Sequence, residues 1–86
     1  MEKRRISLMV AASKALDYKK KNPNAEIGEI MHSIMKDNEI IESAKTNAVP
    51  AVTRAIKYKE STNLNDKQIL QKIMNEMPEI IVSTKH

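Results

Sequence analysis

The stretch LNDKQILQKIMNEM at residues 64–77 carries the clearest structural signal in the chain. Its Asn65 can accept a hydrogen bond from the Gln68 backbone amide while the Gln68 side chain bonds back to Asn65, which is the pattern of a capping box. Leu64 and Ile69 bracket this pair as a hydrophobic staple. The apolar residues that follow recur at helical spacing and predict one buried face, formed by Ile69, Leu70, Ile73, Met74 and Met77. We therefore predict a helix that begins at Asn65 and ends at Pro78.

Two helices are predicted upstream from the same apolar periodicity. The first runs from Lys3 to Lys20, and the lysine run Lys19, Lys20 and Lys21 complements the negative end of its dipole. The second begins near Asn24, a residue type that caps helices well. The predicted buried faces are Ile6, Leu8, Met9, Val10, Ala12, Ala15 and Leu16 in the first helix and Ile27, Ile30, Met31, Ile34 and Met35 in the second.

Residues 24–48 are compatible with one helix or with two. Apolar residues recur every seven positions at Ile27, Ile34, Ile41 and Ala48, so a single long helix would keep its stripe. The adjacent Asp37-Asn38 pair is poor in a helix interior and good as a cap, and it therefore favours a turn there.

A proline determines where we expect the next helix to begin. Proline lacks the backbone donor that an interior helical position needs, whereas the first turn of a helix tolerates it. Asn47 as cap would place Pro50 in that first turn, and the helix would then run to about Glu60. Its predicted buried residues are Val49, Val52, Ala55 and Ile56.

The composition favours an all-α fold. The chain has 86 residues and a single glycine, too few for the turns of a sheet protein. We predict one helical domain spanning residues 1–86, a small single-core bundle of four helices, or of five if residues 24–48 divide. Residues 79–86 form an apolar C-terminal tail that we expect to dock on the bundle or to contact another chain.

The sequence also argues against several functional classes. It has no cysteine, hence no disulfide or thiolate chemistry, and its apolar runs fall short of the roughly 18–20 residues of a membrane span. Glu29 and His32 form a lone Glu-x-x-His, which we interpret as an exposed ion pair because metal-binding bundles need a second such pair. No serine lies in a glycine elbow and no glycine loop could hold a phosphate. We therefore expect a cytoplasmic protein that is not an enzyme and has no cofactor, no metal and no membrane partner.

Nucleic acid is the first partner that the sequence suggests. Fifteen basic residues against eleven acidic ones give a net charge of +4, which favours acidic partners. The segment from Glu39 to Tyr58 can form a helix, a short turn and a second helix starting near Ala48. Within it, residues 52–56 (VTRAI) resemble the recognition helix of lac-repressor-type regulators, whose valine and isoleucine pack inward while polar neighbours face DNA.

This resemblance covers about 20 residues and implies a contact patch for double-stranded DNA. The predicted nucleic-acid-binding residues are Thr53, Arg54, Lys57, Lys59, Lys19, Lys20 and Lys21. The sequence departs from the family pattern in two places. The turn holds Thr46-Asn47 where the family has glycine, and Glu42 stands where the family has a small residue.

A protein-interaction module is the alternative from a different class. Six methionines could form an adaptable apolar surface, although most coincide with predicted core positions. A small core with leftover apolar residues is also typical of a homodimer, in which Ile40, Ile80, Ile81 and Val82 would contribute to a shared interface.

Overall fold

The computed structural model describes residues 2–83 of the chain, which form five helices. These are α1 (Glu2–Lys21), α2 (Ile27–Met35), α3 (Glu42–Ser61), α4 (Asp66–Asn75) and α5 (Met77–Ser83). No strand occurs among these residues. The predicted all-α bundle is therefore confirmed, with five helices. Within the described part of the chain, no helix is long and apolar enough to cross a membrane.

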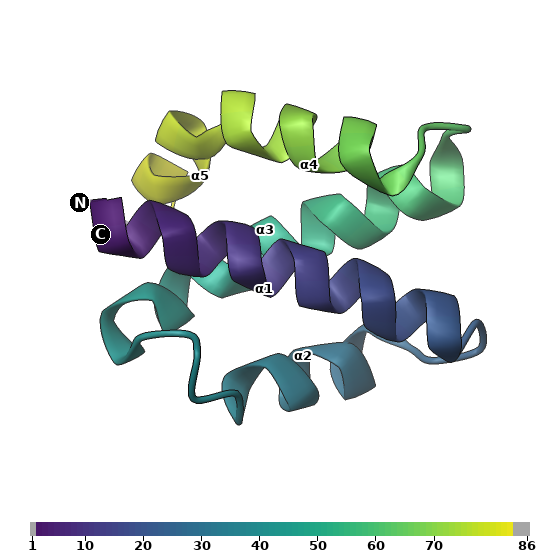
Figure 1. Ribbon diagram of the computed structural model, residues 1–86, viewed down its shortest axis with the longest axis horizontal. Coiled ribbons are helices and arrows are strands. Elements are labelled where there is room, and N and C mark those ends of the chain that lie inside the picture. Colours follow the sequence, from purple (N-terminus) through teal and green to yellow (C-terminus); the bar gives the residue numbers. More distant parts are fainter. Residues whose placement is uncertain (1, 84–86) are drawn as a thin grey trace.

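The two longest helices, α1 and α3, form the centre of the bundle, with α4 along one side, α2 along the other and α5 at one end (Figure 1). Alanines fill the seam between α1 and α3, and small side chains let two helices approach closely. The fully buried alanines are Ala11, Ala12 and Ala15 of α1 and Ala44, Ala48, Ala51 and Ala55 of α3. Larger side chains close the core around this seam, including Leu8, Leu16, Ile30, Ile40, Val52, Ile69, Ile73, Met77 and Ile80.

The predicted turn between residues 24 and 48 is present. Helix α2 ends at Met35, and the Asp37 carboxylate accepts a hydrogen bond from the Glu39 backbone amide at 2.8 Å. This Asp37 contact holds the chain in a turn, so the segment forms two helices. The start of α2 differs from the prediction, because Glu26 and not Asn24 is its cap, and it makes no side-chain capping bond.

The predicted helix start at Asn47 is wrong. Helix α3 runs without interruption from Glu42 to Ser61 and contains Pro50 in its interior. Asn47 is buried, and its amide nitrogen donates to the Ile81 carbonyl oxygen of α5 at 3.3 Å. The alanine seam continues through both sides of Pro50, so tertiary packing outweighs the local preference of proline.

The capping box at the start of α4 is confirmed. The Gln68 amide donates to Asn65 Oδ1 at 2.8 Å, and the Asn65 amide donates to Gln68 Oε1 at 2.9 Å. The predicted helix end at Pro78 is wrong, because α4 ends at Asn75 and Pro78 lies in the first turn of α5, which proline tolerates. The predicted docking of the tail holds for Ile80, which is fully buried, while residues 84–86 lie outside the described part.

Four residues assigned to buried faces are in fact exposed. They are Ile6 (60%), Ile27 (42%), Val49 (46%) and Met74 (53%). Each lies at the edge of an apolar stripe that is wider than the neighbouring helices can cover.

Candidate functional site

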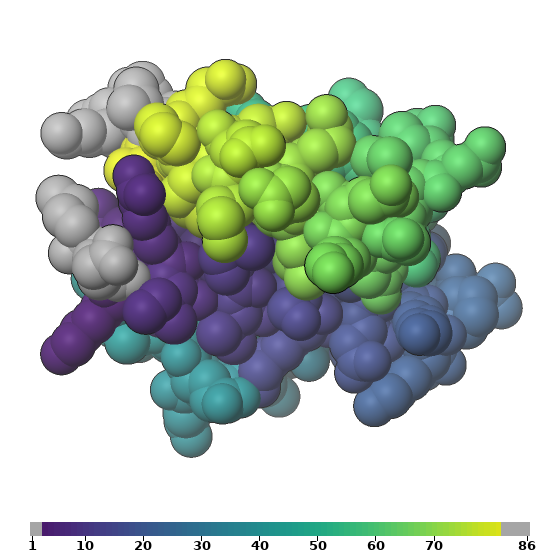
Figure 2. Space-filling view, turned by 45° about the horizontal axis from the view of Figure 1, so that its top comes forward, coloured from purple at the N-terminus to yellow at the C-terminus, as the bar shows by residue number. Residues whose placement is uncertain are grey.

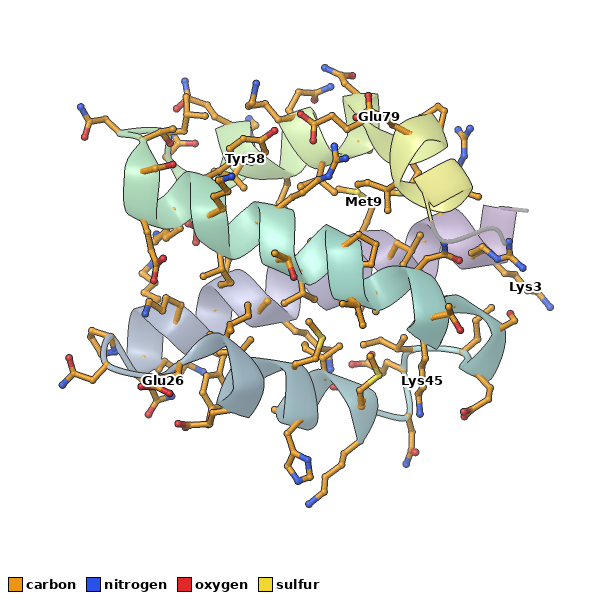
Figure 3. The ribbon with its side chains drawn as sticks, turned by 180° about the vertical axis from the view of Figure 1, so that it is seen from behind. Lys3, Met9, Glu26, Lys45, Tyr58 and Glu79 are labelled. Carbon is orange, nitrogen blue, oxygen red and sulfur yellow. The ribbon has the colours of Figure 1, made fainter. Side chains whose placement is uncertain are left out.

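The predicted DNA-contact residue Arg54 forms a junction between helices. Its Nη1 donates to Glu76 Oε1 at 2.9 Å and its Nη2 to Glu79 Oε1 at 3.1 Å. Tyr58 donates to the other Glu76 oxygen at 2.5 Å, and Lys72 lies over the Tyr58 ring at 5.1 Å. Burial of Glu76 acts to raise its pKa, but the hydrogen bonds from Tyr58 and Arg54 outweigh it, and the pKa is lowered. These contacts join α3, α4 and α5 (Figure 3).

Most of the other predicted cations are also engaged within the chain. Lys59 pairs with Asp66 at 2.7 Å, and Lys21 pairs with Asp17 at 3.2 Å. Thr53 donates its hydroxyl to the Val49 carbonyl oxygen at 2.7 Å. Short intramolecular contacts of this kind reduce the number of cations that are ready to meet phosphate.

The structure brings the end of α1, which carries Lys19, Lys20 and Lys21, next to the end of α3, whereas Arg54 lies beside Glu76 and Glu79. Lys19 of α1 pairs with Glu60 of α3 at 3.2 Å and also donates to the Ala25 carbonyl oxygen at 2.9 Å. Lys20 and Lys57 are exposed on these two helices. The helix-turn-helix prediction for residues 39–58 is wrong, because Thr46 and Asn47 lie inside α3 and form no turn.

The Glu29 and His32 positions do not assemble a metal site. Glu29 accepts a hydrogen bond from the Tyr18 hydroxyl at 2.5 Å, and His32 is exposed. Across residues that the structure describes, no group of three or more His, Asp or Glu side chains is placed to hold a metal ion.

An apolar groove lies along α1 between α4 and the loop that follows α2. Its larger part has a volume of 530 Å³, and an adjoining part of 230 Å³ shares Ile6, Met9 and Met74 with it. The remaining lining residues are Arg5, Val10, Ser13, Lys14, Glu39, Leu70 and Met77. Figure 2 shows the face concerned, with α1 in purple between α4 and α5 above and the segment after α2 below.

Helix geometry explains how the sequence builds this groove. Ile6, Met9 and Ser13 are three and four residues apart on α1, so they lie on one face, and Leu70 and Met74 are related in the same way on α4. Ile6 and Met74 are the most exposed large apolar side chains of the described residues.

No family model matches the chain, and no curated protein or solved structure matches it either.

The two ends of the groove carry different charged groups. Arg5 lines the end near the start of α1. At the other end, Lys14 donates to Asp37 at 2.6 Å and also pairs with Glu39. The Lys14 ammonium, together with the Glu39 amide, lowers the pKa of Asp37, and the two carboxylates raise the pKa of Lys14. The groove lining at this end therefore consists of Lys14 and Glu39, with Asp37 behind them and Lys45 close enough to act on Asp37.

Sequence reasoning assigned the apolar groove residues to the core and so missed the groove. The available signal was the width of the first apolar face, which spans Ile6, Met9 and Val10 as well as the buried Leu8 and Ala12. An apolar face this wide is buried completely only if two helices pack against it along its whole length. Helix α4 is only ten residues long and covers part of it.

Proposed function

We propose that this protein is a non-catalytic protein-interaction module that binds an apolar helical segment in the groove along α1. The observation that carries the proposal is the exposure of Ile6 and Met74 beside an apolar groove of 530 Å³. A folded chain gains free energy by burying such side chains, and contiguous exposed apolar surface is characteristic of interaction sites.

Three methionines fit this role. Met9, Met74 and Met77 line the groove where it narrows beside Arg5. Methionine side chains are unbranched and polarizable, so they adapt to apolar partners of differing shape. An amphipathic helix with apolar anchors at positions i, i+3, i+4 and i+7 is the type of ligand that such grooves bind.

The test uses the methyl groups of these methionines as NMR reporters. A synthetic amphipathic helical peptide with leucines at the four anchor spacings is titrated into the protein. We expect the signals of Met9, Met74 and Met77 to shift, and Met74→Glu to weaken binding by about tenfold, because it puts a charge into an apolar site. Ile27→Glu is the matched control, since Ile27 is exposed on α2 and outside the groove. Equal loss in both variants, or shifts confined to other residues, would contradict the proposal.

Binding of double-stranded DNA is a second candidate from a different class. It is favoured by the Lys19–Glu60 contact, which joins the ends of α1 and α3 and brings the exposed Lys20 and Lys57 to the same end of the molecule. Cations there would neutralise phosphates, and the affinity would fall steeply as salt rises.

Lys57→Glu is the appropriate variant for this candidate. Arg54→Glu would instead put a third carboxylate beside Glu76 and Glu79 and disturb the fold. We expect Lys57→Glu to weaken binding to random duplex DNA in fluorescence anisotropy and to reduce its salt dependence. An unchanged salt dependence in the variant would contradict the patch.

A further inference from the structure

We propose that the occupant of the groove is a second copy of this chain, related to the first by a two-fold axis that passes near Met9. The inference rests on the proposed function, because it names the partner of the same groove. The groove-lining face of α1 packs against the same face of the other copy, so both copies contribute the same surface.

The charge distribution along the groove carries this inference. Arg5 lines one end, and Lys3 is exposed nearby and directed away from the bundle (Figure 3). None of the ion pairs among the described residues involves Arg5. At the other end, Glu39 is 69% exposed even though it pairs with Lys14. It therefore keeps the capacity to bind a second cation.

A two-fold axis makes these two ends complementary. Arg5 and Lys14 are nine residues apart on α1, which is about 14 Å along a helix axis. Rotation by half a turn about an axis between them exchanges the Arg5 end of the groove for the Glu39 end. Arg5 of each copy then faces Glu39 of the other, so that the same pair forms twice, as an isologous interface requires. A parallel arrangement would instead place like charges opposite each other.

The shape of the groove face is also suited to a contact between two identical copies. An isologous contact needs projecting and recessed parts on one surface. Ile6 and Met74 project, while the groove floor beside Met9 and Leu70 is recessed. Burial of the two projecting side chains against a second copy supplies the apolar centre, and the Arg5–Glu39 pairs form its rim.

The experiment measures molar mass by light scattering across a concentration series of the full chain. We expect the unmodified protein to dimerise. Arg5→Glu and Glu39→Arg should each weaken the dimer by about tenfold, because each variant puts like charges together at both symmetry-related contacts. An equimolar mixture of the two variants should dimerise again. In the mixed dimer, the carboxylate introduced by Arg5→Glu in one copy meets the guanidinium introduced by Glu39→Arg in the other, and the second contact keeps its original pair.

Restored association in the mixture supports the antiparallel contact, because a change in folding would not be reversed by mixing. Circular dichroism of each variant verifies its helicity. A protein that stays monomeric at all concentrations, or a mixture that stays monomeric although the unmodified chain dimerises, overturns the inference. The groove proposal would still stand in either case if the leucine peptide shifts the methionine signals of the monomer, and it would fail separately if the peptide does not.

Discussion

Glu76 is an acceptor shared by two side chains of α3 at the end of α4. It caps α4 and accepts hydrogen bonds from both Arg54 and Tyr58. Its side chain is 21% exposed, so these donors matter more than they would at an open surface. Removing the charge would leave Arg54 with Glu79 alone.

We predict that Glu76→Gln lowers the free energy of unfolding at neutral pH by about 1–2 kcal/mol, the typical cost of losing a charge-assisted hydrogen bond. The folded-state pKa of Glu76 is depressed. Its contribution is therefore present above the unfolded value of about 4.3 and is lost as the pH falls through the folded value. Chemical denaturation at several acidic pH values should show a weaker pH dependence in the variant. Glu26→Gln is the control, because Glu26 is exposed and makes no side-chain capping bond. An equal acid response in all three proteins would contradict the role of Glu76.

Contacts between residues close together in the sequence could be predicted, whereas contacts between distant residues could not. The Asn65–Gln68 capping box was predictable because both partners lie within one turn. The environment of Arg54 was not, because Glu76 and Glu79 are 22 and 25 residues away in the chain. From the sequence alone, a basic residue on a helix can therefore be taken for a DNA contact, because the acidic residues that pair with it in the fold are not apparent.

At the scale of elements, the uninterrupted course of α3 through Pro50 is the main departure from local propensity. Proline in a helix interior removes one backbone hydrogen bond and costs about 3 kcal/mol relative to alanine. The helix nevertheless continues, because its buried alanines pack against α1 on both sides of the proline.

Pro50→Ala should therefore stabilise the protein, by about 1–3 kcal/mol if the surrounding packing adjusts. The measurement is the midpoint of thermal unfolding followed by circular dichroism. Pro78→Ala serves for comparison and should have little effect, because Pro78 lies in the first turn of α5, where no backbone donor is required. A lower midpoint for Pro50→Ala would mean that the shape imposed by the proline ring is needed for packing.

For the whole molecule, the class of fold followed from helical periodicity and from the near absence of glycine. The turn after α2 followed from Asp37-Asn38. The groove did not follow, because hydrophobicity alone cannot tell that Ile6 and Met74 remain uncovered while Leu8 and Ile73 are buried. That distinction depends on how far each neighbouring helix extends, which only the assembled bundle determines. Ile40 and Ile80, which were predicted to contribute to a dimer interface, are both buried within the chain, so that part of the prediction is wrong.

The two tyrosines give the molecule a particular weakness in alkaline solution. Tyr18 of α1 donates to Glu29 of α2, and Tyr58 of α3 donates to Glu76 at the end of α4, so each phenol joins two helices. The adjacent carboxylate and partial burial raise the pKa of both phenols. Because a raised pKa favours the neutral phenol in the fold, this stabilisation is present below the unfolded value of about 10 and is lost as the pH rises further. Each tyrosinate would then face a carboxylate of the same sign, and the hydrogen bonds that join α1 to α2 and α3 to α4 at these tyrosines would both be lost in alkaline solution.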